Sequence, residues 1–268
     1  MTADVPELIG LIPAAGQARR LGVLPCSKEI YPIGFGPSDG GPDLRPKAAC
    51  QYLLESMRAA GARKVFIVLR DGKWDIPAYL GDGYALDVHL AYLIMRLPFG
   101  VPYTLDQAYP FVRHAIVALG FPDLLFQPAD AYAQLLERQA DRSAEIVLGL
   151  FPAGRPTKTD RVELDRDGRV RAVVTRARQG DSRATWILAV WTPAFTQFMH
   201  EHLAAMPVSG LADGRREGVE LSMSDVIRAA IDEGLTVDSV VFSEGRFVDI
   251  GTPEDLVATV REYSRVSR

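Results

Sequence analysis

The chain has 268 residues, of which 48% are hydrophobic, so it can bury a sizeable core. Its formal net charge of −4 argues against a general nucleic-acid binder, which is normally basic, so any anion site must be local. Two cysteines outside any C-x-x-C pair indicate neither a zinc site nor a disulfide framework. The N-terminus lacks a signal-peptide core, and the longest apolar windows are too short for a membrane span. We therefore expect a cytoplasmic protein with neither a nucleic-acid nor a membrane partner.

The first half of the chain has the pattern of an α/β layer. An apolar run at Leu8–Ile12 predicts a buried strand, and Phe35–Pro46, rich in Gly, Pro and Asp, predicts a loop or flap. A helix within Lys47–Ala60 and a strand at Val65–Leu69 follow, and a crossover of this length predicts a parallel pair of strands. The further elements expected here are a short helix near Trp74, strands at Val88–Ile94, His114–Leu119 and Glu145–Phe151, and helices near Asp106–Val112 and Ala129–Ala140.

The second half mixes antiparallel strands with helices. D-R-D-G between Arg161–Leu164 and Val170–Thr175 predicts a hairpin. The other predicted elements are strands at Thr185–Trp191, Val237–Phe242 and Arg246–Ile250, and helices at Pro193–Ala204, Ser222–Glu233 and Glu254–Tyr263. No linker composition separates the halves, so we expect a single domain over residues 1–268. Its nucleotide-binding half would reach to about residue 150, and the second half would begin at about residue 151.

The first predicted strand leads into a candidate anion site. Small residues at 14–16 follow it, and Arg20 and Lys28 come a few residues later. Such a loop leaves backbone N–H groups open to an anion, and basic side chains beyond it can clamp the charge. The patterns G-x-G-x-x-G and G-x-x-x-x-G-K-[ST] are absent, so this is no dinucleotide or P-loop fingerprint. The alternative is an ordinary turn whose charges are solvated.

Two aspartates follow predicted strand ends on either side of this loop. Asp123 closes the sequence L-G-F-P-D, at the position where open α/β sheets place their ligands, and Asp249 stands at the end of the last strand. Asp123 could instead cap a helical turn, and Asp249 could brace the turn before Pro253. Because both aspartates lie at strand ends beside the predicted anion loop, we favour a shared metal site.

Taken in order, these motifs resemble the sugar-1-phosphate nucleotidylyltransferases, the sugar-nucleotide pyrophosphorylases of the glucose-1-phosphate thymidylyl/uridylyl type. The likeness is carried by P-A-A-G-Q-A-R-R-L at Pro13–Leu21, C-S-K-E-I-Y-P at Cys26–Pro32, L-G-F-P-D at Leu119–Asp123, G-V-E-L-S-M-S-D-V at Gly218–Val226 and F-V-D-I-G-T-P-E-D-L at Phe247–Leu256. The resemblance implies a Rossmann-like, glycosyltransferase A-like three-layer α/β fold around a mixed, mainly parallel sheet. It also implies the transfer of a nucleotidyl group from an NTP to a sugar 1-phosphate, by Mg²⁺-assisted in-line attack on the α-phosphate.

The resemblance further implies roles for single residues. Arg20 would hold the triphosphate and stabilise the leaving pyrophosphate, and Lys28 would neutralise phosphate near the reacting centre. Asp123 and Asp249 would share one Mg²⁺. The nucleotide-binding positions implied in this way are Ala14, Ala15, Gly16, Gln17, Leu105 and Gln107.

On the sugar side, Glu220 would accept hydrogen bonds from sugar hydroxyls, and Arg176 would replace the family's lysine on the sugar phosphate. Glu220 also fits a simpler role as an acid near the start of its helix. Ala18 stands where the family has a glycine, and so does Thr104 in the base-reading segment, which leaves TTP, UTP and CTP open.

Ala18 and the sequence Gly-Phe-Pro-Asp at residues 120–123, where the family has an adjacent Gly-Asp pair, motivate one alternative: a catalytically degenerate regulatory homologue that binds a nucleotide or NDP-sugar. A second alternative is a nucleotidyltransferase for a phosphorylated non-sugar alcohol. Relatives of this type commonly self-associate, so a homo-oligomer is compatible with the sequence, although no segment singles out an interface. The Gly/Pro-rich insertion at residues 34–46 could serve as a lid or a partner contact.

Overall fold

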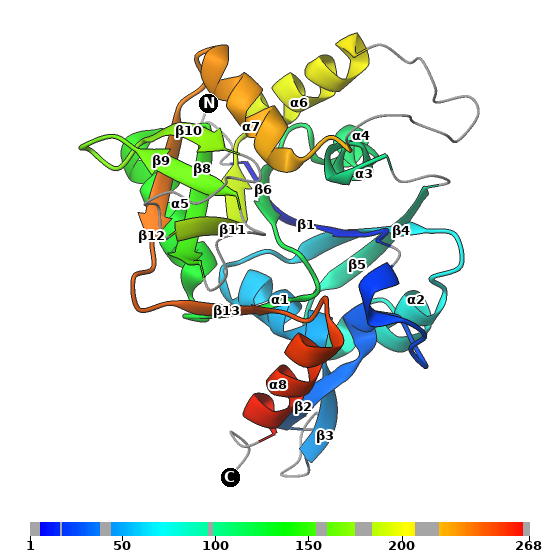
Figure 1. The fold of residues 1–268 in the computed structure, drawn as a ribbon. Helices are drawn as coiled ribbons and strands as arrows, with labels where there is room; N and C mark the ends of the chain where they lie inside the picture. The colour runs from blue at the N-terminus through cyan, green and yellow to red at the C-terminus, as the bar shows by residue number, and fades with distance from the viewer. Residues whose placement is uncertain are drawn as a thin grey trace.

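A seven-stranded mixed sheet forms the centre of the computed structural model, which describes residues 6–16, 18–37, 44–95, 99–153, 160–174, 184–206 and 220–264 (Figure 1). In spatial order its strands are β12 (Val237–Val241), β8 (Ile146–Pro152), β11 (Ala184–Trp191), β6 (Ile116–Leu119), β1 (Leu8–Ala14), β4 (Lys64–Arg70) and β5 (His89–Met95). Of these seven strands, β11 runs antiparallel to both of its neighbours, and the other pairings are parallel. The predicted mixed, mainly parallel sheet is confirmed.

The predicted strand–helix–strand unit at the start of the chain is also confirmed. Strands β1 and β4 are parallel neighbours, with Leu11 opposite Phe66, and α1 (Ala49–Ala59) forms the crossover. The helix begins where the Gln51 side chain accepts the N–H of Ala48 at 2.7 Å, and it ends before Gly61, whose φ of 104° suits glycine. This crossover brings the ends of β1 and β4 to the same edge of the sheet.

Helices cover both faces of the sheet. Along β1, Ile9 and Leu11 point into one apolar cluster and Ile12 and Ala14 into another, as alternation along a strand requires. The first cluster includes side chains of α3 (Val101–Asp106), α4 (Tyr109–Val112), α6 (Pro193–Ala205) and α7 (Met223–Asp232), and the second those of α1 and α5 (Ala131–Arg142). The result is the three-layer arrangement expected for strands that are buried on both faces.

A smaller set of elements lies beyond the carboxyl edge of β1, in the lower part of Figure 1. It contains the ribbon β2 (Pro32–Pro37)–β3 (Leu44–Ala48), the pair β7 (Leu124–Gln127)–β13 (Arg246–Asp249) and α8 (Pro253–Tyr263). Its apolar cluster is formed by Leu21, Ile33, Ala49, Leu125, Ile250 and Leu256. Leu21 of this cluster anchors the single turn η1 (Arg19–Leu21), whereas Ile30 anchors the single turn η2 (Lys28–Ile30) in the cluster that includes α1 and α5.

The predicted hairpin is present as β9 (Arg161–Leu164) and β10 (Val170–Val174), and α2 (Asp75–Leu80) and η3 (Tyr84–Leu86) complete the described elements. The loop predicted at Phe35–Pro46 is wrong for the described part, because Gly36 pairs with Arg45 in an antiparallel ribbon. Among the described strands each ribbon strand has only one partner, so its prolines need no second set of hydrogen bonds. Among the described helices, none is long and apolar enough to cross a bilayer.

Candidate active site

A cavity of about 460 Å³ opens at the carboxyl end of β1. Its lining includes Ala15, Gly16 and Ala18 of the loop after β1, Lys28 and Glu29 of η2, Gly100, Val101 and Thr104 at the start of α3, Phe121 and Asp123 after β6, and Glu220. The carboxyl edge of a parallel sheet is the place where open α/β folds bind ligands. The cavity therefore joins five segments that are far apart in the sequence at one edge of the sheet.

The loop after β1 follows a path that favours glycine. Ala18 has φ 51° and ψ 29°, in the left-handed region where a side chain is strained. Ala15 and Gly16 line the cavity, whereas Ala14 is buried as the last residue of β1 and does not line it. Gln17, predicted to bind nucleotide, lies outside the described residues.

Two ion pairs stand side by side at this site. Lys28 pairs with Asp123, and both side chains are mostly buried, at 14% and 18% exposure. Arg20 pairs with Asp249 at 3.7 Å, with side chains 58% and 43% exposed. Each predicted metal-binding carboxylate is thus accompanied by one of the two predicted phosphate-binding cations.

Strand pairing explains why the two carboxylates meet. Asp249, the last residue of β13, lies opposite Leu124, the first residue of β7. The next residue, Ile250, donates its N–H to the carbonyl of Asp123 at 3.1 Å. Asp123 and Asp249 therefore come together although 126 positions (249 − 123) separate them in the sequence.

The pKa values of these groups reflect the shared site. Burial raises the pKa of Asp249, and the nearby charge of Asp123 adds to this effect, while Lys28 and Arg20 oppose it. Burial lowers the pKa of Lys28, but the contact with Asp123 and the charges of Glu29 and Asp249 together outweigh burial and leave this pKa raised. The Oδ1 atom of Asp249 is buried and has no hydrogen-bond partner among the described residues. One carboxylate oxygen at the site is thus unsatisfied.

This donor set fits Mg²⁺ that arrives with a triphosphate. Within the described part of the chain, no cluster of three or more His, Cys, Asp or Glu side chains could hold a metal ion by itself. Mg²⁺ commonly takes one or two carboxylates and fills its remaining positions with substrate phosphates and water. Asp123 and Asp249, with the unsatisfied Oδ1 of Asp249, provide hard oxygen ligands of this kind.

The other predicted site residues divide into two groups. Glu220 is exposed and lines the cavity on the α3 side, next to Gly100. Leu105 is fully buried in the core, and Gln107 is exposed with its amide donating to the Tyr103 carbonyl at 3.3 Å, so neither side chain lines the cavity. Thr104 lines it instead. Arg176 lies outside the described residues.

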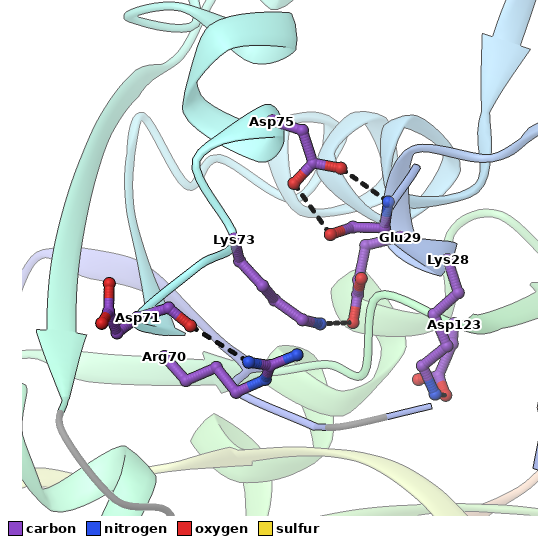
Figure 2. Close-up of polar contacts among 8 residues, drawn as sticks. Lys28, Glu29, Arg70, Asp71, Lys73, Asp75 and Asp123 are labelled. Atoms are coloured by element: carbon purple, nitrogen blue, oxygen red, sulfur yellow. Dashed lines mark hydrogen bonds and ion pairs between the residues drawn. The ribbon is translucent and has the colours of Figure 1, made fainter. Parts of the chain in front are cut away.

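Sequence reasoning missed a group of charged residues around Glu29, a residue of the cavity lining (Figure 2). Lys73 donates to Glu29 at 2.5 Å, and their side chains are only 5% and 2% exposed. Burial lowers the pKa of Lys73, and the charge of Glu29 opposes this effect. Asp75 accepts two hydrogen bonds from Ser27. The available signal was the position of Lys73 and Asp75 just after a predicted buried strand, at the edge that carries the anion loop.

A mainly parallel α/β sheet whose carboxyl edge joins an open small-residue loop, paired cations and two carboxylates is typical of a protein that binds nucleotide phosphates. No family model matches the chain. Curated relatives include two glucose-1-phosphate thymidylyltransferases, 26% identical over 217 residues in Streptomyces antibioticus and 27% over 212 residues in Streptomyces griseus. The low-salt glycan biosynthesis nucleotidyltransferase Agl11 of Haloferax volcanii is 22% identical over 212 residues.

These alignments cover 78–79% of the chain but 56% of each relative, so the chain spans about half the length of the curated relatives it matches. A crystal structure from Bacillus anthracis, solved in complex with a sucrose under the provisional name of a glucose-1-phosphate thymidylyltransferase, superposes with a TM-score of 0.79. It covers 96% of this chain and 95% of the neighbour at 16% identity, which shows the shared fold. The relatives confirm the resemblance to the sugar-1-phosphate nucleotidylyltransferases that the motifs indicate.

Proposed function

We propose that this chain transfers a nucleotidyl group from an NTP to a sugar 1-phosphate, giving an NDP-sugar and pyrophosphate. One observation carries the proposal: Asp123 and Lys28 in the cavity lining lie next to Asp249 and Arg20, which stand outside the lining, so that two carboxylates meet and each has its own cation. The names of the curated relatives support a nucleotidyltransferase and make TTP and glucose 1-phosphate the first pair to test.

The chemistry needs little from the protein besides placement and positive charge. A sugar phosphate already carries an anionic oxygen, so its attack on the α-phosphate requires no general base. The barrier comes from bringing two polyanions together and from charge on the departing pyrophosphate, which positioning and cations lower. When bound by Asp123 and Asp249, Mg²⁺ would neutralise part of the phosphate charge.

The chain's own residues supply the remaining interactions. Lys28, kept charged by Asp123, presents its ammonium from the cavity wall to the reacting phosphate. Arg20, more than half exposed and 3.7 Å from Asp249, can turn toward the triphosphate without leaving a buried site. The backbone N–H groups of Ala15 and Gly16, which line the cavity, would donate to the nucleotide, and Glu220 across the cavity would accept hydrogen bonds from sugar hydroxyls.

The test is pyrophosphate release with Mg²⁺ and a panel of TTP, UTP and CTP against sugar 1-phosphates. Asp123→Asn and Asp249→Asn should abolish release while the proteins stay folded, and Arg20→Ala should lower kcat by about 10²–10³, as loss of a transition-state donor does. Asp141→Asn, an exposed carboxylate on α5, is the matched control and should turn over like the wild type. Wild-type turnover in either site aspartate variant would contradict the metal assignment.

The same panel separates the two alternatives. Nucleotide binding without release, for every acceptor tried, would indicate a regulatory homologue. Release only when a phosphorylated non-sugar alcohol is the acceptor would change the substrate class and leave the transfer chemistry intact. The strained left-handed conformation of Ala18 in the cavity lining is the feature that keeps the non-catalytic alternative open.

A further inference from the structure

Lys28 lies in a secondary-structure element that is too short to fix the position of Lys28 by itself. The element η2 is a single 3-10 turn of three residues, Lys28–Ile30. Such a turn makes few hydrogen bonds of its own and takes its position from its surroundings. The position of the Lys28 backbone is therefore set by contacts of the residues around it: Ile30 packs in the apolar cluster beside α1, and Ser27 and Glu29 make polar contacts.

Both neighbours of Lys28 are held by one short segment, in which Lys73 lies in the connection between β4 and α2 and Asp75 is the first residue of α2 (Figure 2). Before Lys28, the backbone N–H of Ser27 donates to Asp75 Oδ2 at 2.6 Å, and the Ser27 hydroxyl donates to Oδ1 at 2.8 Å. After Lys28, the Glu29 carboxylate accepts from the Lys73 ammonium at 2.5 Å. Residues 27 and 29 are thus tied to residues 75 and 73, and Lys28 between them points to Asp123.

Stability alone is a weak reason for this arrangement. Taking Lys73 and Glu29 out of water is costly, and two apolar side chains of similar size would usually fill the same space at no loss. One oxygen of Glu29, Oε2, is buried without a hydrogen-bond partner among the described residues. What the ion pair provides, and an apolar pair would not, is a directional contact that fixes the turn.

We propose that Lys73 and Asp75 are positioning residues that hold the backbone on both sides of Lys28, so that its ammonium stays beside Asp123 at the cavity. Neither residue lines the cavity, so both act through Lys28. For catalysis this inference rests on the proposed function, in which Lys28 acts on the reacting phosphate. Displacement of a catalytic group by about 1 Å can lower the rate about 100-fold. Loss of the contacts made by Lys73 and Asp75 should therefore change kcat more than KM.

The placement of Lys28 can be measured independently of catalysis, by NMR of the ligand-free protein labelled with ¹³C at the lysine ε-carbons. The signal of Lys28 is assigned as the one that disappears in the Lys28→Met variant. Asp75→Ala and Lys73→Met should each move the Lys28 signal toward those of exposed lysines, because the ion pair with Asp123 loosens. Asp75→Asn keeps one acceptor for Ser27 and should give an intermediate shift. Asp71→Ala is the matched control, since Asp71 is exposed on the same connection and, among the described residues, only its backbone carbonyl accepts a hydrogen bond, from Arg70. An unchanged Lys28 signal in Asp75→Ala and Lys73→Met would overturn the inference.

Kinetics provide the second measurement. Asp75→Ala should lower kcat at least about tenfold, with KM for the NTP within about threefold, and Asp75→Asn should recover part of kcat. Asp71→Ala should keep both constants. A rise in KM with kcat unchanged would overturn the assignment of a role in the reacting step. If the wild type releases no pyrophosphate with any substrate pair, the proposed function fails, and the NMR experiment still decides whether Lys73 and Asp75 place Lys28.

Discussion

The buried pair of Lys73 and Glu29 leads to a quantitative prediction about folding stability. The two side chains are 5% and 2% exposed, so Lys73→Met would leave a carboxylate without its counter-charge inside the protein. Breaking a buried pair in this way costs about 3–5 kcal/mol. At about 2–4 °C per kcal/mol for a chain of this size, the melting temperature should fall by about 6–20 °C. The measurements are urea unfolding followed by circular dichroism and a thermal scan.

Two control variants test whether the unpaired buried carboxylate causes the expected loss of stability. The double variant Glu29→Met/Lys73→Met places two apolar side chains in the same volume and should return close to wild-type stability. Lys64→Met is the matched single substitution, because Lys64 pairs with Glu7 at 2.9 Å on the surface, where such pairs contribute about 0–1 kcal/mol. If Lys73→Met costs no more than Lys64→Met, the reasoning about the buried carboxylate is refuted.

Two further predictions concern the cavity. Burial, and after it the charge of Asp123, raises the pKa of Asp249, so the folded protein binds the carboxyl proton of Asp249 more tightly than the unfolded chain does. Folding stability is therefore lost as the pH rises from 3.8, the ordinary pKa, through the pKa in the folded state. In EDTA, Asp249→Asn should therefore have a higher melting temperature than the wild type at pH 7 and the same melting temperature near pH 3. Addition of Mg²⁺ should not raise the melting temperature of this variant. A melting temperature below that of the wild type at pH 7 would contradict the predicted sign. Gly100→Ala should cost about 1–3 kcal/mol, because φ is +117° and the new Cβ would lie 2.5 Å from the Leu221 carbonyl oxygen. Gly16→Ala, with open space around its Cβ, is the control in the same urea titrations, and an equal cost in both would reject the steric argument.

Local patterns were sufficient to predict most of the central sheet. An apolar run at Leu8–Ile12, followed by a helix and a second apolar run, predicted the parallel pair β1–β4, because each strand is buried on both faces. Patterns failed where strands are short or contain proline. The four-residue strand β7 has too few residues for a period. Helix α3 was not predicted, because Leu97–Gln107 is rich in proline and glycine, although proline is tolerated in the first turn of a helix, where Pro102 lies.

Prediction of the candidate site from the sequence meets the same limit, because local patterns do not reveal contacts between distant residues. Asp123 and Asp249 could be predicted because each lies at or near a strand end, although the pairing of β7 with β13 that joins them lies outside the central sheet. The contacts of Glu29 with Lys73 and of Ser27 with Asp75 join residues that are 44 and 48 positions apart, and no local sequence pattern predicts these contacts. They depend on how η2 lies against the β4–α2 connection, which is a property of tertiary packing.

Ala18 provides the most direct test of the loop that begins the site. Its left-handed conformation costs a non-glycine residue about 1–2 kcal/mol, whereas glycine there would lose about 0.4–1 kcal/mol more in chain entropy on folding. Ala18→Gly should therefore raise the free energy of unfolding by about 1 kcal/mol or less, and leave nucleotide affinity and turnover at least at wild-type values. Ser143→Gly is the matched control, because Ser143 has φ 47° at the end of α5 and does not line the cavity, so its stability change should be similar with no effect on binding. Tenfold weaker binding in Ala18→Gly alone would mean that the Ala18 methyl group shapes the nucleotide site, and that this loop departs from the glycine-containing loop it resembles.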